Sequence, residues 1–287
     1  MPDQGPEQSS IQTEHKRCVE LCTRVARLSD IGRHRRNNQD YYLVLPVDES
    51  AVPPNSEPGP FTTVNGRLLL AVADGMGGHF GGEVASRMCC ENLAKELPDR
   101  IRAPENGQAD LPTALRSAIE VVHRALYAHA QSYAEGRIMG TTLTAVLIHD
   151  TRAELAQIGD SRAYLFRAGK LILLTQDQTI GSQLSRQGQS ASTVDASLQN
   201  LLIQAVGAQE EIKVSMGAVD LEPDDVLLVC CDGLSKVVSP EEIVETLELE
   251  IGLEEKAAHL VGRANENGGP DNITVILAEI RAVEGSG

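Results

Sequence analysis

Apolar residues recur along this chain in short blocks, and the spacing inside each block predicts its secondary structure. Apolar runs at 41–45, 68–73 and 226–231, and a mainly apolar, strand-like run at 273–280, are typical of buried strands. Residues 18–28 alternate apolar and polar side chains, which indicates a half-buried strand. Further strands are predicted at 141–148, 153–158, 162–166, 171–174 and 212–219, and a buried segment at 201–206.

Two long segments, 82–101 and 111–133, instead repeat their apolar residues with helical spacing. We expect these two helices to pack antiparallel on a sheet. Ser239, Pro240 and Glu242 form a helix-start signature, which predicts a helix at 241–249 and a second one at 253–265. A short helix is also predicted near 181–187.

An aspartate stands at one end of each of the four apolar runs. Asp74 and Asp232 follow their runs and precede glycines, whereas Asp40 and Asp271 come just before theirs. Taken singly, an Asp-Gly pair indicates only a turn. Four carboxylates at strand ends raise the prospect of one site assembled by the fold, and carboxylate oxygens suit magnesium and manganese. The spacing alone leaves both interpretations open.

Composition narrows the class of protein. The chain has 287 residues, 41% of them hydrophobic but only 3% aromatic, so we expect a sizeable aliphatic core. Its net charge of −16 argues against nucleic acid as a main partner and against attraction to an anionic membrane.

No apolar run approaches the length of a membrane span, and residues 1–16 are expected to be a disordered tail without a signal core. Residues 48–65, rich in proline, are interpreted as an exposed loop.

Six cysteines occur, four of them as the adjacent pairs Cys89-Cys90 and Cys230-Cys231. Adjacent cysteines inside an apolar helix and an apolar strand are typical of small buried side chains rather than of disulfides. This pattern favours a reducing compartment, so we expect a cytoplasmic protein.

An ordered set of short motifs resembles the metal-dependent Ser/Thr protein phosphatases of the PPM (PP2C-like) family, in its bacterial form. The resemblance runs from about Arg17 to Ile280. Its pieces, in chain order, are Ser29-Asp30-Ile31-Gly32 with Arg35 to Asp40, Asp74-Gly75-Met76-Gly77-Gly78-His79 with Gly82-Glu83 and Ala85-Ser86, Met139-Gly140-Thr141-Thr142, Ile158-Gly159-Asp160-Ser161-Arg162, Leu174-Thr175-Gln176-Asp177, Asp232-Gly233-Leu234, and Gly268-Gly269-Pro270-Asp271-Asn272-Ile273-Thr274-Val275.

The pattern of elements alone predicts an α+β protein, and the resemblance implies a four-layer α/β/β/α sandwich of two antiparallel sheets flanked by helix pairs. The phosphatase domain would span residues 17–281, with a flap at 176–200 and a short tail at 282–287. The implied activity is hydrolysis of phosphoserine and phosphothreonine in proteins by a water that bridges two divalent cations, Mn²⁺ or Mg²⁺. Such an enzyme would reverse the signalling of Ser/Thr kinases in bacteria.

The resemblance also implies a role for each motif residue. Asp74 would bridge the cations, the Gly75 carbonyl would bind one of them, and Asp232 and Asp271 would complete one coordination sphere. Asp40 would act on the other cation, and Asp160 would help to hold a third. Arg35 would clamp the phosphate, since a planar guanidinium can bind two phosphate oxygens. Without the resemblance, the run of basic residues at 33–36 would be interpreted as a solvent-exposed loop.

Four positions depart from the family pattern. Gln39 replaces a frequent Glu, Gln178 a frequent His, Lys236 a frequent Asp, and Met76 the His of eukaryotic members. The general acid is therefore open, and His79 could serve either that role or the turn itself. Asn272 is expected to orient main chain rather than to bind metal.

Two alternatives remain beside the general phosphatase. One is a catalytically weak or inactive regulator that binds phosphoproteins, for which Gln39 is the support. The other is a phosphatase with a narrower substrate, of the sporulation or stress-response type. For the main hypothesis we expect phosphorylated proteins as partners, including a Ser/Thr protein kinase, and a monomeric enzyme.

Overall fold

The computed structural model describes residues 21–48, 61–64, 66–77, 81–102, 110–132, 139–188 and 195–283. Their strands form two antiparallel sheets. The first sheet has the order β3 (Phe61–Val64), β1 (Leu21–Asp30), β12 (Ile273–Ala282), β11 (Val226–Cys230), β8 (Arg162–Arg167) and β9 (Lys170–Leu173). The second has the order β10 (Ser215–Asp220), β7 (Arg152–Ile158), β6 (Leu143–His149), β4 (Leu68–Met76) and β2 (Asp40–Pro46), and β5 (Gly140–Thr141) pairs with β4.

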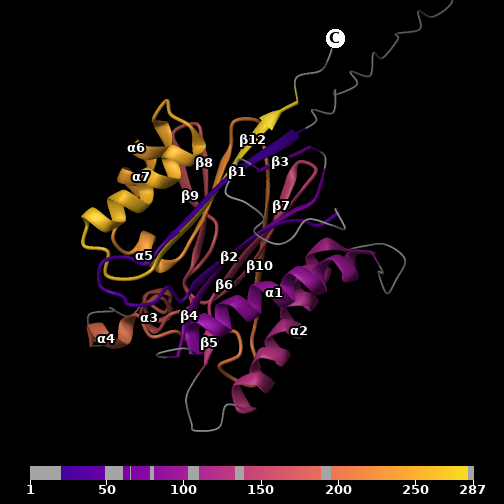
Figure 1. Cartoon of the computed structure of the whole chain (residues 1–287), viewed down its shortest axis with the longest axis vertical. Helices are drawn as coiled ribbons and strands as arrows, with labels where there is room; N and C mark the ends of the chain where they lie inside the picture. Colours follow the sequence, from indigo (N-terminus) through magenta and orange to yellow (C-terminus); the bar gives the residue numbers. More distant parts are fainter. Residues whose placement is uncertain are drawn as a thin grey trace, which may run out of the picture.

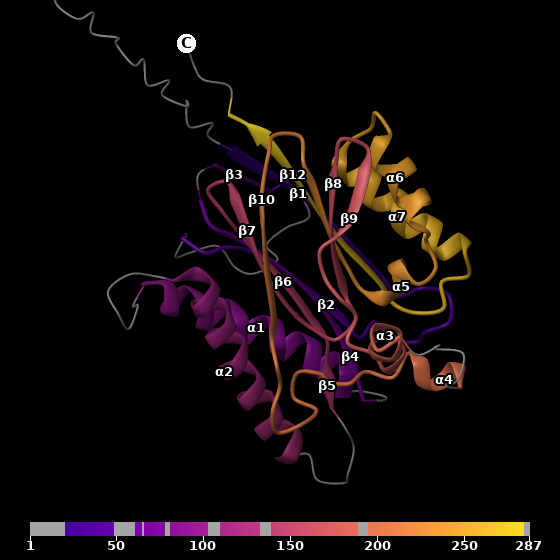
Figure 2. The same cartoon turned by 180° about the vertical axis from the view of Figure 1, so that it is seen from behind.

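Helices cover the outer faces of both sheets. Figures 1 and 2 show α1 (Gly81–Arg102) and α2 (Leu111–Ser132) against the second sheet, and α6 (Pro240–Glu248) and α7 (Leu253–Glu266) against the first. Three short helices, α3 (Ile180–Arg186), α4 (Ala196–Gln199) and α5 (Asp232–Ser235), lie together at one end of the sandwich. The predicted four-layer α/β/β/α architecture is therefore confirmed.

The continuous apolar run of β4 is explained by burial on both of its faces. Leu68, Leu70 and Val72 point into the layer between the two sheets, where they meet apolar residues of β11 and β12. Leu69 and Ala71 point the other way, into the layer under α1 and α2. Because successive side chains of a strand point to opposite faces, a strand with helices on one side and a sheet on the other has no polar face.

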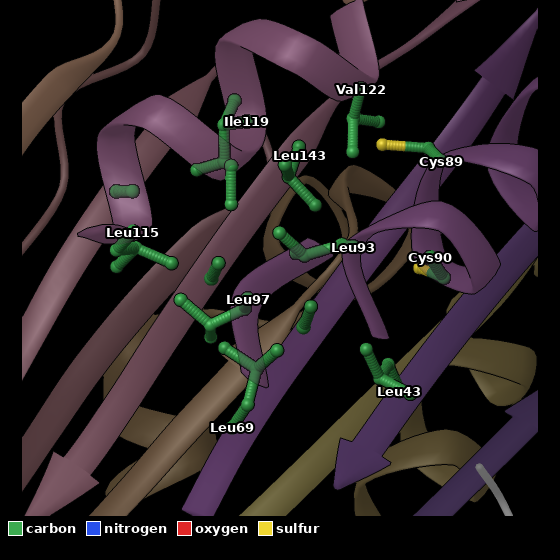
Figure 3. Packing of buried hydrophobic residues seen from close by; sticks show 14 of the residues in the cluster. Leu43, Leu69, Cys89, Cys90, Leu93, Leu97, Leu115, Ile119, Val122 and Leu143 are labelled. Atoms are coloured by element: carbon green, nitrogen blue, oxygen red, sulfur yellow. The ribbon is translucent and has the colours of Figure 1, made fainter. Parts of the chain in front are cut away.

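The layer between the second sheet and its helices is aliphatic, as the composition predicts. Figure 3 shows Leu93 and Leu97 of α1 packed with Ile119 of α2 and Leu69 of β4. The Cys89 thiol is buried in the same cluster, and Cys90, Cys230 and Cys231 are buried free thiols as well. The prediction that the adjacent cysteines are small buried side chains is confirmed.

The capping box predicted at Ser239 is also confirmed. The Ser239 hydroxyl accepts a hydrogen bond from the Glu242 amide at 3.2 Å, and the Glu242 carboxylate accepts one from the Ser239 amide at 2.9 Å. These two bonds satisfy amides at the start of α6 that have no partner inside the helix.

Two sequence predictions were wrong in part. The segment 48–65 was interpreted as a loop, but Phe61–Val64 forms β3 at the edge of the first sheet, paired with β1; residues 49–60 and 65 lie outside the described residues. The segment 201–206 was expected to be buried, yet Leu201 and Ile203 are 52% and 42% exposed. Main-chain bonds to Ile180 and Gln178 hold Leu201 and Ile203 in place without burial of their side chains, whereas Ala205 and Val206 at the end of the segment are buried as predicted.

The expected tail at 1–16 and the residues after 283 lie outside the described residues. Of the helices in the described ranges, none has both the length and the apolarity that crossing a membrane requires.

Candidate active site

The four predicted carboxylates meet at one end of the sandwich because of how the strands pair. Asp40, the first residue of β2, lies directly opposite Asp74 near the end of β4, in the second sheet. In the first sheet, the end of β11 pairs with the start of β12, which places Asp232 and Asp271 at the same edge. The site is thus shared between the two sheets.

A cavity of about 660 Å³ opens at this edge. Its lining includes most of the predicted site residues, namely Arg35, Asp74, Gly75, Asp160, Asp232 and Asp271, together with Lys236, Asn272 and Leu201. Asp40 is 8% exposed and is not part of the lining. The structure therefore brings all the predicted residues to one place, with Asp40 behind the cavity wall.

Hydrogen bonds between the two sheets fix the position of Asp40. The Thr274 hydroxyl of β12 donates to Asp40 Oδ2 at 2.7 Å, across the interface of the sheets. Thr274 Oγ1 in turn lies 2.7 Å from Ser29 Oγ, which accepts a hydrogen bond from the Asn38 side chain. Sequence analysis did not assign a role to Ser29 or Thr274, although both belong to motifs that carry the resemblance.

Asn272 connects three stretches of main chain. Its Oδ1 accepts a hydrogen bond from the Gln39 amide at 2.8 Å, and its Nδ2 donates to the carbonyl oxygens of Ile31 and Asn37 at 2.9 and 3.0 Å. The side chain is therefore used up in holding the loop before Asp40. The expectation that Asn272 orients main chain agrees with these contacts.

The main chain around Asp74 is held as firmly. The Asp74 amide donates to Thr142 Oγ1 at 3.0 Å, while the Asp74 carbonyl accepts from the Thr142 amide and the Thr141 hydroxyl at 2.8 and 2.9 Å. The next amide, that of Gly75, donates to the Gln39 carbonyl at 3.1 Å. Sequence analysis noted the Thr141-Thr142 motif but missed this function, because nothing local in the sequence links it to residue 74.

Glycines are required where the main chains of the site touch. A Cβ atom on Gly75 would overlap the carbonyl oxygen of Gly82 in α1. A Cβ atom on Gly233 would likewise overlap the carbonyl oxygen of Asn272. The Asp-Gly pairs that look like turns in the sequence therefore mark places where two segments pack backbone to backbone.

Burial raises the proton affinity of two of the carboxylates, those of Asp40 and Asp74. It raises the pKa of Asp40 to about 7, with the charges of Asp232 and Asp271 acting in the same direction. It also raises the pKa of Asp74 well above its ordinary value, and Asp40 is the main charged neighbour that adds to the shift. Without a cation, negative charges at this density oppose one another.

Two buried oxygen atoms without hydrogen-bonding partners indicate that a cation fits here. Asp40 Oδ1 and Asp232 Oδ1 are both buried and have no hydrogen-bonding partner. A buried acceptor without a partner is costly, so unpaired oxygens among several carboxylates indicate a binding place for a cation. The donor set, carboxylate oxygens with a main-chain carbonyl, is the one that Mg²⁺ and Mn²⁺ prefer.

The protein's own cations contact three of the carboxylates. Arg35 Nη2 donates to Asp271 Oδ2 at 2.6 Å, and this hydrogen bond is the main cause of a raised pKa of the guanidinium. Lys236 Nζ lies 2.5 Å from Asp232 Oδ2 and 3.3 Å from Asp160 Oδ2. Within the described ranges, no three His, Cys, Asp or Glu side chains already stand as a group that could hold a metal ion. A cation bound here would compete with Arg35 and Lys236 for the oxygens that they now contact.

Two departures from the family pattern have visible roles. Gln178 Oε1 accepts a hydrogen bond from the Gly159 amide at 2.8 Å, so it holds the turn that carries Asp160. Gln39 contacts its neighbours through main chain, since its carbonyl accepts from Gly75 and from the Ser86 hydroxyl. Met76 lies in the cavity lining, whereas His79 is outside the described residues.

Comparisons with known proteins agree with this arrangement. A family model described as Protein phosphatase 2C matches residues 60–277. The Serine/threonine phosphatase stp of Listeria monocytogenes is 33% identical over 256 residues, which cover 88% of this chain and 93% of that protein.

Solved structures show the same fold. A serine/threonine phosphatase of S. agalactiae superposes with a TM-score of 0.76 at 31% identity, covering 90% of this chain and 99% of the other. The catalytic domain of the phosphatase PstP, solved in complex with two manganese ions, gives a TM-score of 0.71 at 35% identity, covering 91% and 99%.

Proposed function

The chain belongs to the protein phosphatase 2C family, and from that premise we propose that it hydrolyses phosphoserine and phosphothreonine in proteins with the help of bound Mn²⁺ or Mg²⁺. The observation that carries the proposal is the convergence of Asp74, Asp232 and Asp271 from two sheets on one cavity, with Asp40 behind its wall and with one oxygen each of Asp40 and Asp232 buried and unpaired.

We assign the cation-binding role to Asp74, the Gly75 carbonyl, Asp232 and Asp271, with Asp40 behind them. Bound divalent cations supply Lewis acidity, which polarises phosphoryl oxygens and makes water a nucleophile at neutral pH. The Asp40 carboxylate is held by the Thr274 hydroxyl, and the main chain that carries Asp74 is held by Thr142, so the segments that carry both acids are fixed without a ligand. Preorganised groups of this kind contribute most to stabilising a transition state.

Arg35 is the residue that we assign to the substrate phosphate. Its side chain is 52% exposed at the cavity and ends in a hydrogen bond to Asp271. A phosphate could replace that carboxylate as a partner, since the guanidinium fork matches two phosphate oxygens. Binding of substrate and release of Asp271 toward a cation would then occur together.

The partners follow from the reaction. The substrates are phosphorylated proteins. As expected from the sequence, we include a Ser/Thr protein kinase among these substrates. The buried free thiols fit a reducing, cytoplasmic environment. As the sequence hypothesis expects, we also propose that the enzyme is monomeric.

The experiment is hydrolysis of a phosphothreonine peptide by the purified chain with Mn²⁺, with Mg²⁺ and with EDTA. Asp74→Asn is the informative variant, because burial already favours a neutral group at this position. We expect phosphate release with either metal, none in EDTA, and a loss of at least about a hundredfold in Asp74→Asn, whose melting temperature in EDTA stays unchanged or rises. A folded wild-type chain that releases no phosphate under any metal would instead support the phosphoprotein-binding regulator.

A further inference from the structure

Lys236 places a positive charge between two elements of the site. It directly follows α5, so its side chain reaches back one turn to Asp232, and its Nζ also contacts Asp160 in the connection from β7 to β8. The Asp160 side chain is 6% exposed and that of Asp232 16%. The ammonium group therefore joins two nearly buried carboxylates that come from distant parts of the chain.

The surroundings keep this ammonium charged. Burial disfavours the charged form of Lys236, but the charges of Asp232 and Asp160 outweigh burial, so its pKa is raised. Asp160 depends on this contact in turn: burial raises its pKa to about 6, and the charge and hydrogen bond of Lys236 act in the opposite direction. The two side chains are thus a mutually stabilised pair at the wall of the cavity.

Asp160 is the residue to which the family resemblance assigns a third divalent cation. That cation does not fit the side chains present, because Lys236 already donates to Asp160 and to the neighbouring Asp232. A lysine side chain offers donors and no acceptor, so it cannot become a ligand. A divalent ion at Asp160 would face the ammonium at close range while competing for the same oxygens.

We propose that the ammonium of Lys236 takes the place of a third divalent cation at Asp160, so that this chain holds two catalytic cations and a built-in positive charge where relatives would bind a further metal ion. The inference rests on the proposed metal-dependent function. It goes beyond it by assigning Lys236 as a positioning residue that fixes Asp160 and Asp232 and sets the metal stoichiometry.

The test is a count of bound manganese by equilibrium dialysis of the full chain, up to millimolar free Mn²⁺. We expect two ions in the wild type and in Lys236→Arg, which keeps a cation at this place. Lys236→Ala vacates the position and Lys236→Asp adds a carboxylate, so both should bind a third ion, more tightly in Lys236→Asp. The double variant Lys236→Ala with Asp160→Asn should return to two ions.

Each outcome separates the inference from the function on which it rests. Three ions in the wild type, or two in both Lys236→Ala and Lys236→Asp, would overturn the inference while leaving the phosphatase intact. No bound manganese in the wild type would overturn the proposed function itself. Because Lys236→Asp could fold poorly without metal, Lys236→Ala provides the independent reading, with its melting temperature in EDTA as the check on folding.

Discussion

The main-chain amide of Gln39 donates a 2.8 Å hydrogen bond to the side-chain Oδ1 of Asn272, a residue 233 positions further along the chain. This bond joins the loop before β2 in the second sheet to the residue just before β12 in the first. It therefore ties together the two acids that flank it, Asp40 and Asp271. The geometry of the site depends on this contact although neither partner is an assigned metal ligand.

Replacing Asn272 should consequently impair both stability and activity. Asn272→Ala leaves the partly buried Gln39 amide and the carbonyls of Ile31 and Asn37 without this partner, so we expect a loss of about 2 to 3 kcal/mol in the free energy of unfolding. Urea denaturation measures the loss. Asn267→Ala, which removes an exposed bond to the Val237 carbonyl and a side-chain contact with Glu242, is the control and should cost less than about 1 kcal/mol.

Replacing Arg35 should separate substrate binding from metal binding. Arg35→Ala removes a charge-assisted partner of the phosphate, so we expect kcat/KM to fall about tenfold to a hundredfold, mainly through KM. The same change frees Asp271 from its 2.6 Å hydrogen bond, so manganese should bind at least as tightly as in the wild type.

Arg36→Ala lies in the same exposed loop, outside the cavity lining, and is the control for a general loss of positive charge. Kinetics with a phosphopeptide and isothermal titration with Mn²⁺ provide the two measurements. Equal effects of the two substitutions, or an unchanged KM in Arg35→Ala, would remove Arg35 from the assigned role.

Gly75→Ala should damage the site through backbone displacement. The added Cβ atom overlaps the Gly82 carbonyl at the start of α1, so either β4 or the helix must shift. We expect activity to fall below detection and the melting temperature to drop by several degrees, as for other strongly overpacked positions.

Gly262→Ala is the matched control for that experiment. Gly262 lies inside α7, and a Cβ atom there meets nothing within 4 Å. The substitution should stabilise the helix by up to about 1 kcal/mol and leave catalysis unchanged. Differential scanning calorimetry of both variants would contradict the packing argument if Gly75→Ala melted like Gly262→Ala.

The stability of the metal-free chain should fall with rising pH. Burial raises the folded-state pKa of Asp40 from 3.8 to about 7, so the folded state binds its proton more tightly than the unfolded state. This contribution to stability is complete below about pH 4 and is lost as the pH rises through about 7. Asp74, whose pKa is raised for the same reason, acts in the same direction.

Thermal melts in EDTA between about pH 5 and pH 8 test this expectation. Asp40→Asn should flatten the dependence relative to the wild type, because an amide has no proton to lose. Added Mn²⁺ should reverse the trend, since metal binding requires deprotonated carboxylates. The role of Asp40 would be contradicted if the melting temperature of the metal-free wild type rose toward pH 8 and rose by the same amount in Asp40→Asn.

Much of the fold could be predicted because its signals are local. The double-sided burial of β4 appears as a continuous apolar run, and the capping box at Ser239 defines the start of α6 within one residue. The edge strand β3 gives no such signal, because Phe61–Val64 is short and follows a proline-rich stretch. Its pairing with β1 depends on residues about forty positions away.

The candidate site likewise has a part that could be predicted from local sequence and a part that could not. The acids themselves could be identified because each stands beside an apolar run and within a family motif. The contacts that orient them could not, since Thr142 and Thr274 reach Asp74 and Asp40 only through tertiary structure. Lys236 was recognised as a departure, but its contact with Asp160 appears only when α5 is packed beside the end of β7.

Because the acids are divided between two sheets, the aliphatic layer between those sheets also sets the geometry of the site. Asp40 and Asp74 belong to one sheet and Asp232 and Asp271 flank strands of the other, so any sliding of the sheets would pull the two pairs apart. Residues such as Val72, Val146 and Ile276 act as the spacer that sets this distance. Conversely, an ion bound by both pairs would act as a crosslink that fastens one sheet to the other.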